Sequence, residues 1–158
     1  MSRAFTKEDD TEFALADIGQ RPVSQYRNLV TRAGLDAIDA EIRQLRAAYS
    51  EAERDGDRQK LAVVSRDMRY WSSRRETAEL VTPERDASVV RFGMTATIED
   101  EDGKTHKWTI VGEDEADAAK GKISHVSPMA MALFGKAVGE EATVNGREWV
   151  VTAIKVAE

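Results

Sequence analysis

The chain has 158 residues, 33% of them charged, and a formal net charge of -6. This length fits one large domain or two small ones. The negative charge argues against binding duplex DNA over the whole surface, because phosphate binding needs a basic field or patch. The chain has no cysteine, which excludes disulfides, thiolate zinc sites and a cysteine nucleophile. The first residues contain no apolar run typical of a signal peptide or membrane span, so we expect a cytoplasmic protein without membrane contact.

Residues 1–27 mix charged residues with Gly19, Pro22 and isolated apolar residues, and they show no sustained period. We predict a flexible leader over this range. The alternative is a segment that becomes ordered on a partner through residues 2–5 and the acidic run 8–10.

Two stretches of similar length follow, and in each of them apolar residues recur in steps of three and four, as in helices that pack together. The first seam contains Leu35, Ile38, Ile42, Leu45, Tyr49 and Ala52, and the second contains Leu61, Val64, Met68 and Trp71. Thr31 is the predicted N-cap of the first helix, and Thr82-Pro83 is the predicted end of the second.

Gly56 supplies the break between the two stretches, because glycine readily ends a helix. We predict an antiparallel coiled-coil hairpin over residues 28–82, with its tip near 55–60 and legs of roughly 33 to 37 Å. An intermolecular coiled coil is the alternative, but seams of matched length around one glycine favour folding back within the chain.

After Pro83 the apolar period becomes two. Residues 94–99 alternate, Asp102-Gly103 marks a turn, and Asn145-Gly146 between two apolar runs is typical of a tight β-hairpin. Ser127-Pro128 predicts the start of a short helix. The predicted fold class is therefore α+β, with the helical hairpin followed by a mostly antiparallel sheet domain with one short helix over residues 83–158.

A self-contained enzyme site is hard to assemble from these residues. The only histidines, His106 and His125, are far apart in the sequence, and no zinc spacing, phosphate-binding loop or nucleophile elbow occurs. The predicted tip gathers several acidic residues, which suit a hard cation such as Mg²⁺. They are Glu51, Glu53, Asp55 and Asp57. Arg54, Arg58 and Lys60 give the tip a mixed sign, and Asp57 has the alternative role of capping the second helix.

Two further charged groups have open interpretations. The second helix carries Arg66, Arg69, Arg74 and Arg75 near two aromatic residues. These arginines form either an exposed helix face or a contact with nucleic acid or an acidic channel wall. The acidic run Asp114, Glu115 and Asp117 is either a solvated loop or a contact surface for a basic partner.

At this point the sequence resembles the GreA/GreB transcript cleavage factors of bacterial RNA polymerase, over nearly all of residues 28–154. The matching segments are residues 30–35, 92–93, 98–106, 110–115, 123–124 and 127–133. Several of them look closer to GreB than to GreA.

The resemblance implies a coiled-coil hairpin followed by a domain similar to FK506-binding proteins. It also implies that this domain docks at the rim of the secondary channel of RNA polymerase while the hairpin enters the channel. The docking residues would be Asp114, Glu115, Ser127, Pro128 and Met129. The arginines of the second helix, Arg66, Arg69, Arg74 and Arg75, look similar to those that contact the RNA 3′ segment. The expected partner is the polymerase core, with nascent RNA contacted only inside it, and the expected state is a monomer.

In active members of this family, two acidic tip residues help to hold a Mg²⁺ ion shared with the polymerase, so no intrinsic cofactor is expected. The first acidic position falls on Asp57, but the second falls on Lys60, whose ammonium repels a cation. Asp55 or Glu53 would substitute only in a remodelled turn, and Arg58 and Lys60 would modify the tip. We therefore expect an accessory factor and not an enzyme, with weakened stimulation of transcript cleavage.

Other classes remain open. A channel-occupying inhibitor or initiation regulator that competes with active Gre factors would share the fold and the partner. A prolyl isomerase is suggested by domain similarity alone, which is a weak argument because folds do not determine function. A purely structural coiled-coil dimer is the third possibility.

Overall fold

The computed structural model describes residues 18–157, so most of the predicted leader, residues 1–17, lies outside the described part. Contacts divide the described residues into two compact units. One unit contains residues 18–25 and 36–77, and the other contains residues 26–35 and 78–157. Within residues 18–157, none of the helices combines the length and the apolar character needed to cross a membrane.

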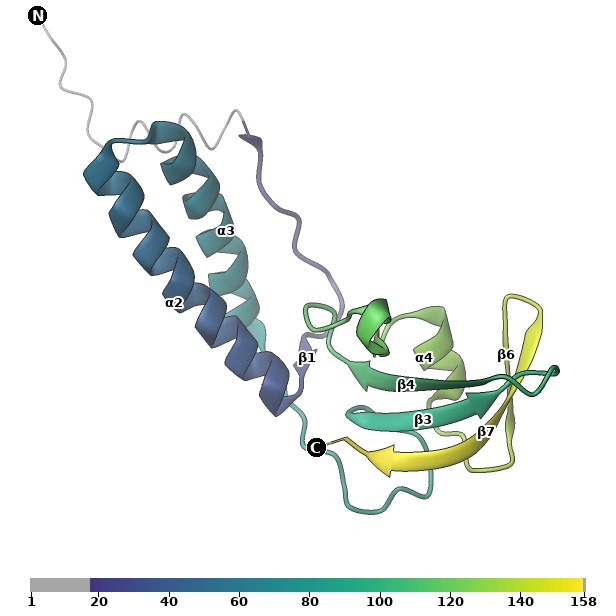
Figure 1. The fold of residues 1–158 in the computed structure, drawn as a ribbon. Helices are drawn as coiled ribbons and strands as arrows, with labels where there is room; N and C mark the ends of the chain where they lie inside the picture. The colour runs from purple at the N-terminus through teal and green to yellow at the C-terminus, as the bar shows by residue number, and fades with distance from the viewer. Residues whose placement is uncertain (1–17, 158) are drawn as a thin grey trace, which may run out of the picture. The chain divides into compact units, whose positions relative to one another are not determined.

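The first unit is built on two antiparallel helices, α2 (Arg32–Asp55) and α3 (Arg58–Thr77), which lie side by side in Figure 1. Two ion pairs connect the helices. Lys60 Nζ lies 3.8 Å from Glu51 Oε2 close to the turn, and Arg75 Nε lies 2.7 Å from Asp39 Oδ1 farther from it. Because positions farther along α3 meet earlier positions of α2, the pairs record the antiparallel register. The predicted hairpin is confirmed.

The packing between the helices follows the predicted seams. The buried seam residues are Leu35, Ile38, Ile42, Leu45, Ala52, Leu61 and Val64. Tyr49, Met68 and Trp71 are only half-buried. The predicted N-cap is also confirmed, because the Gly34 N–H donates to Thr31 Oγ1 at 2.9 Å.

The second helix ends at Thr77, earlier than the predicted end at Thr82-Pro83. Just after it, β2 (Glu79–Leu80) pairs in parallel with β1 (Leu29–Val30). The Glu79 N–H donates to the Asn28 carbonyl at 2.8 Å and the Val81 N–H donates to the Val30 carbonyl at 3.0 Å. A helix continued through these residues could not make both bonds, so strand pairing ends the helix.

A bidentate ion pair adds to this strand pairing. Arg27 Nη2 and Nε donate to the two Glu79 carboxylate oxygens at 2.9 and 3.2 Å. The hydrogen bond from Arg27 lowers the pKa of the Glu79 carboxyl.

The second unit contains a five-stranded sheet in the order β5-β4-β3-β7-β6. Its strands are β3 (Met94–Glu99), β4 (Thr105–Val111), β5 (Lys122–Ser124), β6 (Glu141–Val144) and β7 (Arg147–Val156). Within this five-stranded sheet, the β4–β5 pair is parallel and the other three pairs are antiparallel. The predicted α+β class with a mostly antiparallel sheet is confirmed, while β5 and the short 3₁₀ helix η1 (Ala118–Lys120) were not predicted.

Local signals in the sequence explain the remaining elements of this unit. Asn145 and Gly146 both adopt positive φ, 52° and 75°, as the tight turn between β6 and β7 requires. The helix α4 (Pro128–Leu133) begins as predicted, with Ser127 Oγ accepting the Ala130 N–H.

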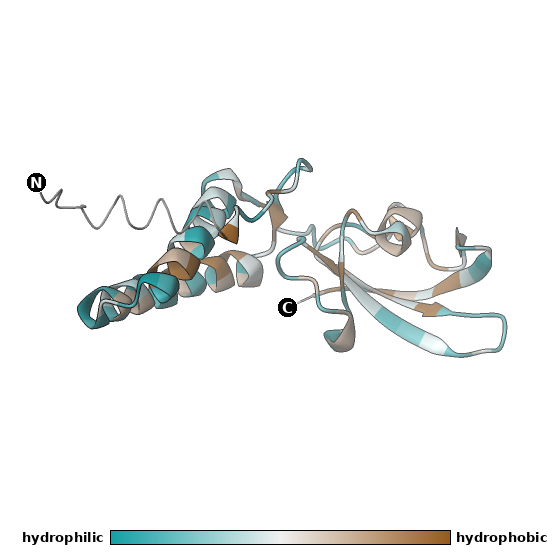
Figure 2. Cartoon of the chain, turned by 90° about the horizontal axis from the view of Figure 1, so that it is seen from above, coloured by the Kyte–Doolittle hydropathy of each residue, from teal (hydrophilic) through white to brown (hydrophobic). Residues whose placement is uncertain are grey.

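The apolar core of the second unit lies between the sheet and α4. Its buried members are Val90, Phe92, Ala96, Ile98, Ile110, Ala130, Leu133, Ala142, Trp149 and Val151. In Figure 2 brown, hydrophobic segments lie on the helix pair as well as on several strands, while the turn between α2 and α3 is mostly hydrophilic. The alternation of buried and half-buried residues along β3 accounts for the period of two in the sequence.

One glycine permits the chain crossing next to β1. A Cβ atom on Gly112 would lie 2.3 Å from the Leu29 carbonyl oxygen, which is closer than any real contact of that kind. Gly34 is also crowded, but there the nearest atom, at 2.7 Å, is the carboxylate oxygen Oε1 of Glu115, at the end of a side chain. The backbone at Leu29 cannot move without breaking the β1–β2 pair, whereas a side chain can rotate.

These two glycines give a matched test of the crossing. Gly112→Ala is expected to lower the free energy of unfolding by about 1–3 kcal/mol, because the added methyl group must displace backbone. Gly34→Ala is expected to cost less than about 1 kcal/mol, because alanine favours the helix and offsets the movement of Glu115. Urea denaturation of both variants measures the difference, and equal midpoints would contradict this account of the crossing.

Candidate functional site

The tip of the hairpin is a turn that uses almost no connecting chain. Gly56 takes φ 64° and its N–H donates to the Glu53 carbonyl at 3.3 Å, while the Asp57 N–H donates to the Ala52 carbonyl at 3.0 Å. These two bonds form a Schellman motif, the usual way in which a glycine closes a helix. The motif satisfies carbonyl groups at the end of α2 and reverses the chain at once.

Asp57 also begins the next helix. Its carbonyl accepts the first helical bond, from the Leu61 N–H at 3.0 Å, and its carboxylate oxygen Oδ1 accepts the Lys60 N–H at 3.1 Å. This is the geometry of an N-cap that bonds to the third helical residue. The capping role that the sequence left open is therefore confirmed, and one carboxylate oxygen already has a backbone partner.

The charges around the turn are mixed, as the sequence predicts. Asp55, Asp57 and Arg58 are exposed, and Glu53 is half-buried. The Lys60 ammonium extends toward Glu51 of α2. The pair is solvent-exposed, so it adds little stability, but it keeps a positive charge beside the turn.

The donor set at the tip does not fit a tightly held divalent cation. Within residues 18–157, no three His, Cys, Asp or Glu side chains come together to hold a metal ion. The position where a second carboxylate would be expected carries an ammonium. A cation near Asp57 would therefore need most of its oxygen ligands from another molecule.

The four arginines of α3 that the sequence singles out differ in their exposure. Arg69 is exposed, whereas the Arg75 guanidinium is held by Asp39 of α2. Arg74 is 1% exposed, so the interpretation of this residue as part of an exposed helix face is wrong. From the sequence alone, a charged residue in a helix is expected at the surface. Only the tertiary packing shows that Arg74 is buried.

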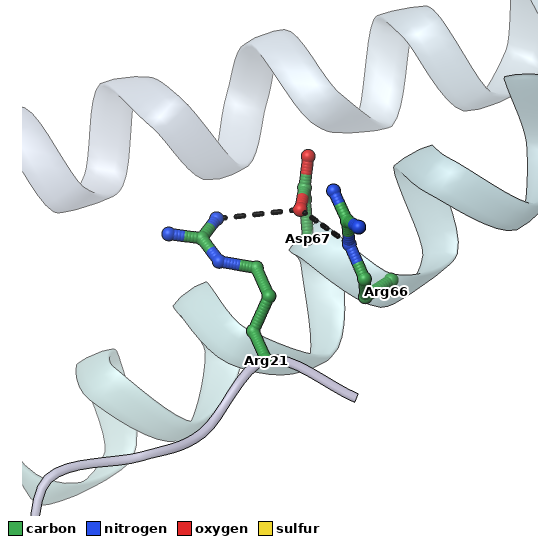
Figure 3. A network of polar contacts seen from close by, with 3 residues as sticks. All are labelled: Arg21, Arg66 and Asp67. Carbon is green, nitrogen blue, oxygen red and sulfur yellow. Dashed lines mark hydrogen bonds and ion pairs between the residues drawn. The ribbon is translucent and has the colours of Figure 1, made fainter. Parts of the chain in front are cut away.

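Arg66 belongs to a small network shown in Figure 3. Its Nε lies 3.2 Å from Asp67 Oδ1, and the same oxygen accepts a bond from Arg21 Nη1 at 3.3 Å. The Arg21 guanidinium also lies over the ring of Tyr70, with its carbon 4.0 Å from the ring centroid. The sequence contained no sign of this contact, because Arg21 is isolated in the leader and its partners are more than 40 residues away.

The acidic run after β4 has structural partners in its own unit. Glu115 is only 13% exposed and accepts a hydrogen bond from Thr31 Oγ1, the N-cap of α2. Lys122 Nζ lies 3.6 Å from its other oxygen. Asp117 caps η1 through the Ala119 N–H at 3.1 Å, and Asp114 is half-buried. These contacts favour a structured loop over a freely solvated one.

The predicted docking residues around α4 include both structural and exposed side chains. Ser127 caps the helix and Met129 packs partly against the core, while Pro128 is exposed. The sequence reading missed three exposed apolar side chains nearby in the chain. These are Met131, Phe134 and Val138, which are 66%, 55% and 57% exposed. With Pro128 they form what we call the α4 patch, and large exposed apolar groups often mark a protein contact.

Known proteins resemble this chain along most of its length. A sequence model of the family described as "Transcription elongation factor, GreA/GreB, C-term" matches residues 84–158. The chain is 32% identical to transcription elongation factor GreA of Paracoccus denitrificans, over 80% of this chain and 96% of that protein. It is 35% identical to transcription elongation factor GreB of Yersinia pestis, over 75% of this chain and 80% of that protein. The solved structure of GreA factor homolog 1 of Thermus thermophilus matches with 22% identity and a TM-score of 0.40, over 82% of this chain and 99% of that one.

The two curated relatives contain positions that this chain lacks. The match with the Paracoccus protein runs over 149 aligned positions but includes 80% of this chain, about 126 of 158 residues, which leaves about 23 positions without a counterpart. The match with the Yersinia protein runs over 137 positions and includes 75% of this chain, about 119 residues, which leaves about 18. This chain is therefore shorter than both relatives within the matched region.

The capping role of Asp57 can be separated from its charge. Asp57→Ala is expected to lower the free energy of unfolding by about 1 kcal/mol, because it removes the N-cap of α3. Asp57→Asn is expected to stay near the wild-type value, since asparagine caps as well as aspartate. Thermal unfolding followed by circular dichroism measures both. Asp55→Ala serves as the control that removes a neighbouring carboxylate, and a loss of stability equal to that of Asp57→Ala would show that the cap is unimportant.

Proposed function

This chain belongs to the GreA/GreB family of transcription elongation factors, and from that premise we propose that it binds bacterial RNA polymerase through the secondary channel and modulates elongation. It acts on backtracked complexes as an accessory factor, and the polymerase remains the enzyme. The observation that carries the proposal is the helical arm that ends in an exposed, charged, tightly closed tip. The functional parts are a leader over 1–27, an arm over 28–82 and a docking domain over 83–158. The arm buries its seam within one chain, which supports a monomeric factor.

The charges at the tip favour weak stimulation of transcript cleavage over strong stimulation. Asp57 supplies one carboxylate, and that group already accepts the Lys60 N–H. The Lys60 ammonium beside it opposes a cation, because a positive charge raises the energy of a nearby divalent ion. The tip therefore offers the polymerase less help in holding Mg²⁺ than a pair of acidic residues would.

The length of the arm supports the same conclusion. The helices have 24 and 20 residues, which correspond to about 36 and 30 Å. We assign the positions missing relative to the two relatives to the arm, because equal loss from two antiparallel helices leaves their packing and the sheet domain intact. About 20 residues shared between the legs would shorten the arm by about 15 Å and reduce its reach into the channel by that length.

The other surfaces are assigned from their exposure. Arg69 and the partly exposed Arg66 remain the arm residues suited to phosphate or an acidic channel wall, because guanidinium binds phosphate in a bidentate manner. Pro128 and the rest of the α4 patch are the residues suited to dock on the polymerase rim. Glu115 and Ser127 have structural contacts near the docking surface: Glu115 accepts a hydrogen bond from Thr31, and Ser127 caps α4.

A cleavage assay on stalled, backtracked complexes tests the main proposal. The wild-type protein is expected to bind but to cause little 3′ cleavage. Lys60→Glu is expected to raise cleavage several-fold if charge limits the tip, with Lys60→Gln as the control that removes the ammonium without adding a carboxylate. Rapid cleavage by the wild-type protein, comparable to that of an active Gre factor, would contradict the disabled tip. No gain from a Lys60→Glu variant that still binds would assign the defect to the reach of the arm.

A second candidate function is favoured by the same observations. A short arm with a positive group at its tip can occupy the channel without supplying a metal ligand, so the protein would compete with active Gre factors or regulate initiation. An order-of-addition assay separates the two functions. If this protein is added before an active factor, cleavage is expected to fall in proportion to channel occupancy. Undiminished cleavage at saturating concentrations would exclude competition.

A further inference from the structure

Arg21 occupies a defined site on the side of α3. Its Nη1 bonds to Asp67 at 3.3 Å, and its guanidinium carbon lies 4.0 Å from the centroid of the Tyr70 ring and 5.8 Å from that of Trp71. These three partners are separated by three and four positions, so they share one face of the helix. A carboxylate beside two aromatic rings is a binding site for a guanidinium group.

The aromatic part of this site is internally ordered. The Tyr70 and Trp71 rings meet edge to face, with centroids 5.1 Å apart and an interplanar angle of 84°. Both residues are half-buried with Arg21 in place, so part of each residue stays exposed beside the guanidinium. Arg21 is itself outside any helix or strand, and its side chain is 37% exposed. The contact therefore attaches a loop segment to an already formed surface.

The site overlaps the surface that we assign to the polymerase contact. Asp67 Oδ1 is shared between Arg21 and Arg66, as Figure 3 shows. While Arg21 is in place, the Asp67 charge is compensated from the leader as well as by Arg66, and both guanidinium groups lie at the same carboxylate oxygen. A partner group that binds at Asp67 next to Arg66 therefore competes with Arg21 for this carboxylate.

We propose that residues 18–25 form a strap, held on α3 by Arg21, that must leave before this side of the arm can contact RNA polymerase. The proposal rests on the function proposed above. The Asp67, Tyr70 and Trp71 site then becomes open to an arginine of the polymerase. The strap is suited to exchange, because a partly exposed ion pair and a surface cation–π contact together favour the closed state by only about 3- to 30-fold.

The affinity of the polymerase core for strap variants tests the idea. A binding-competent state that is populated only in part lowers the apparent affinity by that fraction, so removing the strap contact raises it. Arg21→Ala is expected to bind about 3- to 30-fold more tightly than the wild-type protein. Arg21→Lys is expected to fall between them, because lysine keeps the charge but loses the planar stacking. Arg27→Ala is the matched control, since Arg27 pairs with Glu79 of β2 and not with a residue of α3.

Hydrogen exchange on the free proteins shows whether the strap itself has been released. Amides of residues 18–25 are expected to exchange faster in Arg21→Ala than in Arg27→Ala, with the helical circular dichroism unchanged in both. Equal affinity of Arg21→Ala and the wild-type protein, with the segment released, would overturn the strap proposal alone. Failure of the wild-type protein and all variants to bind the core would overturn the proposed function, and the strap proposal with it.

Discussion

The structure of the arm depends on a turn in which one residue serves two helices. Asp57 receives the closing bond of α2 through its N–H and starts α3 through its carbonyl and carboxylate. Because only Gly56 and Asp57 separate the helices, no loop is available to shift one leg against the other. The register of the seam, and the ion pairs at Lys60 and Arg75, follow from that turn.

The shortness of this turn also limits the chemistry of the tip. A carboxylate that caps a helix is well positioned, but one of its oxygens is committed to the backbone. The residues that follow Asp57 belong to α3, so their side chains are distributed around the helix and do not gather at the turn. Lys60, the third residue of α3, consequently extends toward α2 and meets Glu51. A tip built in this way is stable and compact, and it presents few free oxygen atoms to a cation.

Features encoded by short-range signals could be predicted from the sequence, and features encoded by distant contacts could not. The helical seams, the Ser127 cap and the Asn145-Gly146 turn each depend on residues within a few positions of one another. The β1–β2 pair depends on two dipeptides about 50 residues apart, so its effect on the end of α3 was invisible. The burial of Arg74 and the contact of Arg21 with Asp67 could not be predicted for the same reason, because both depend on packing that the local sequence does not encode. At the tip, the sequence left a capping role for Asp57 open, and the bond from the Lys60 N–H identified the cap.

The paired legs have a consequence for how such arms can vary in length. A leg that loses residues keeps its seam toward its partner only if the loss is close to a whole number of turns, such as 7 or 11 residues, and the partner must lose the same number. These losses correspond to steps of about 10 and 16 Å. Arms of this design would therefore differ in reach by discrete steps, and a population of related proteins would sort into length classes with no continuous series between them.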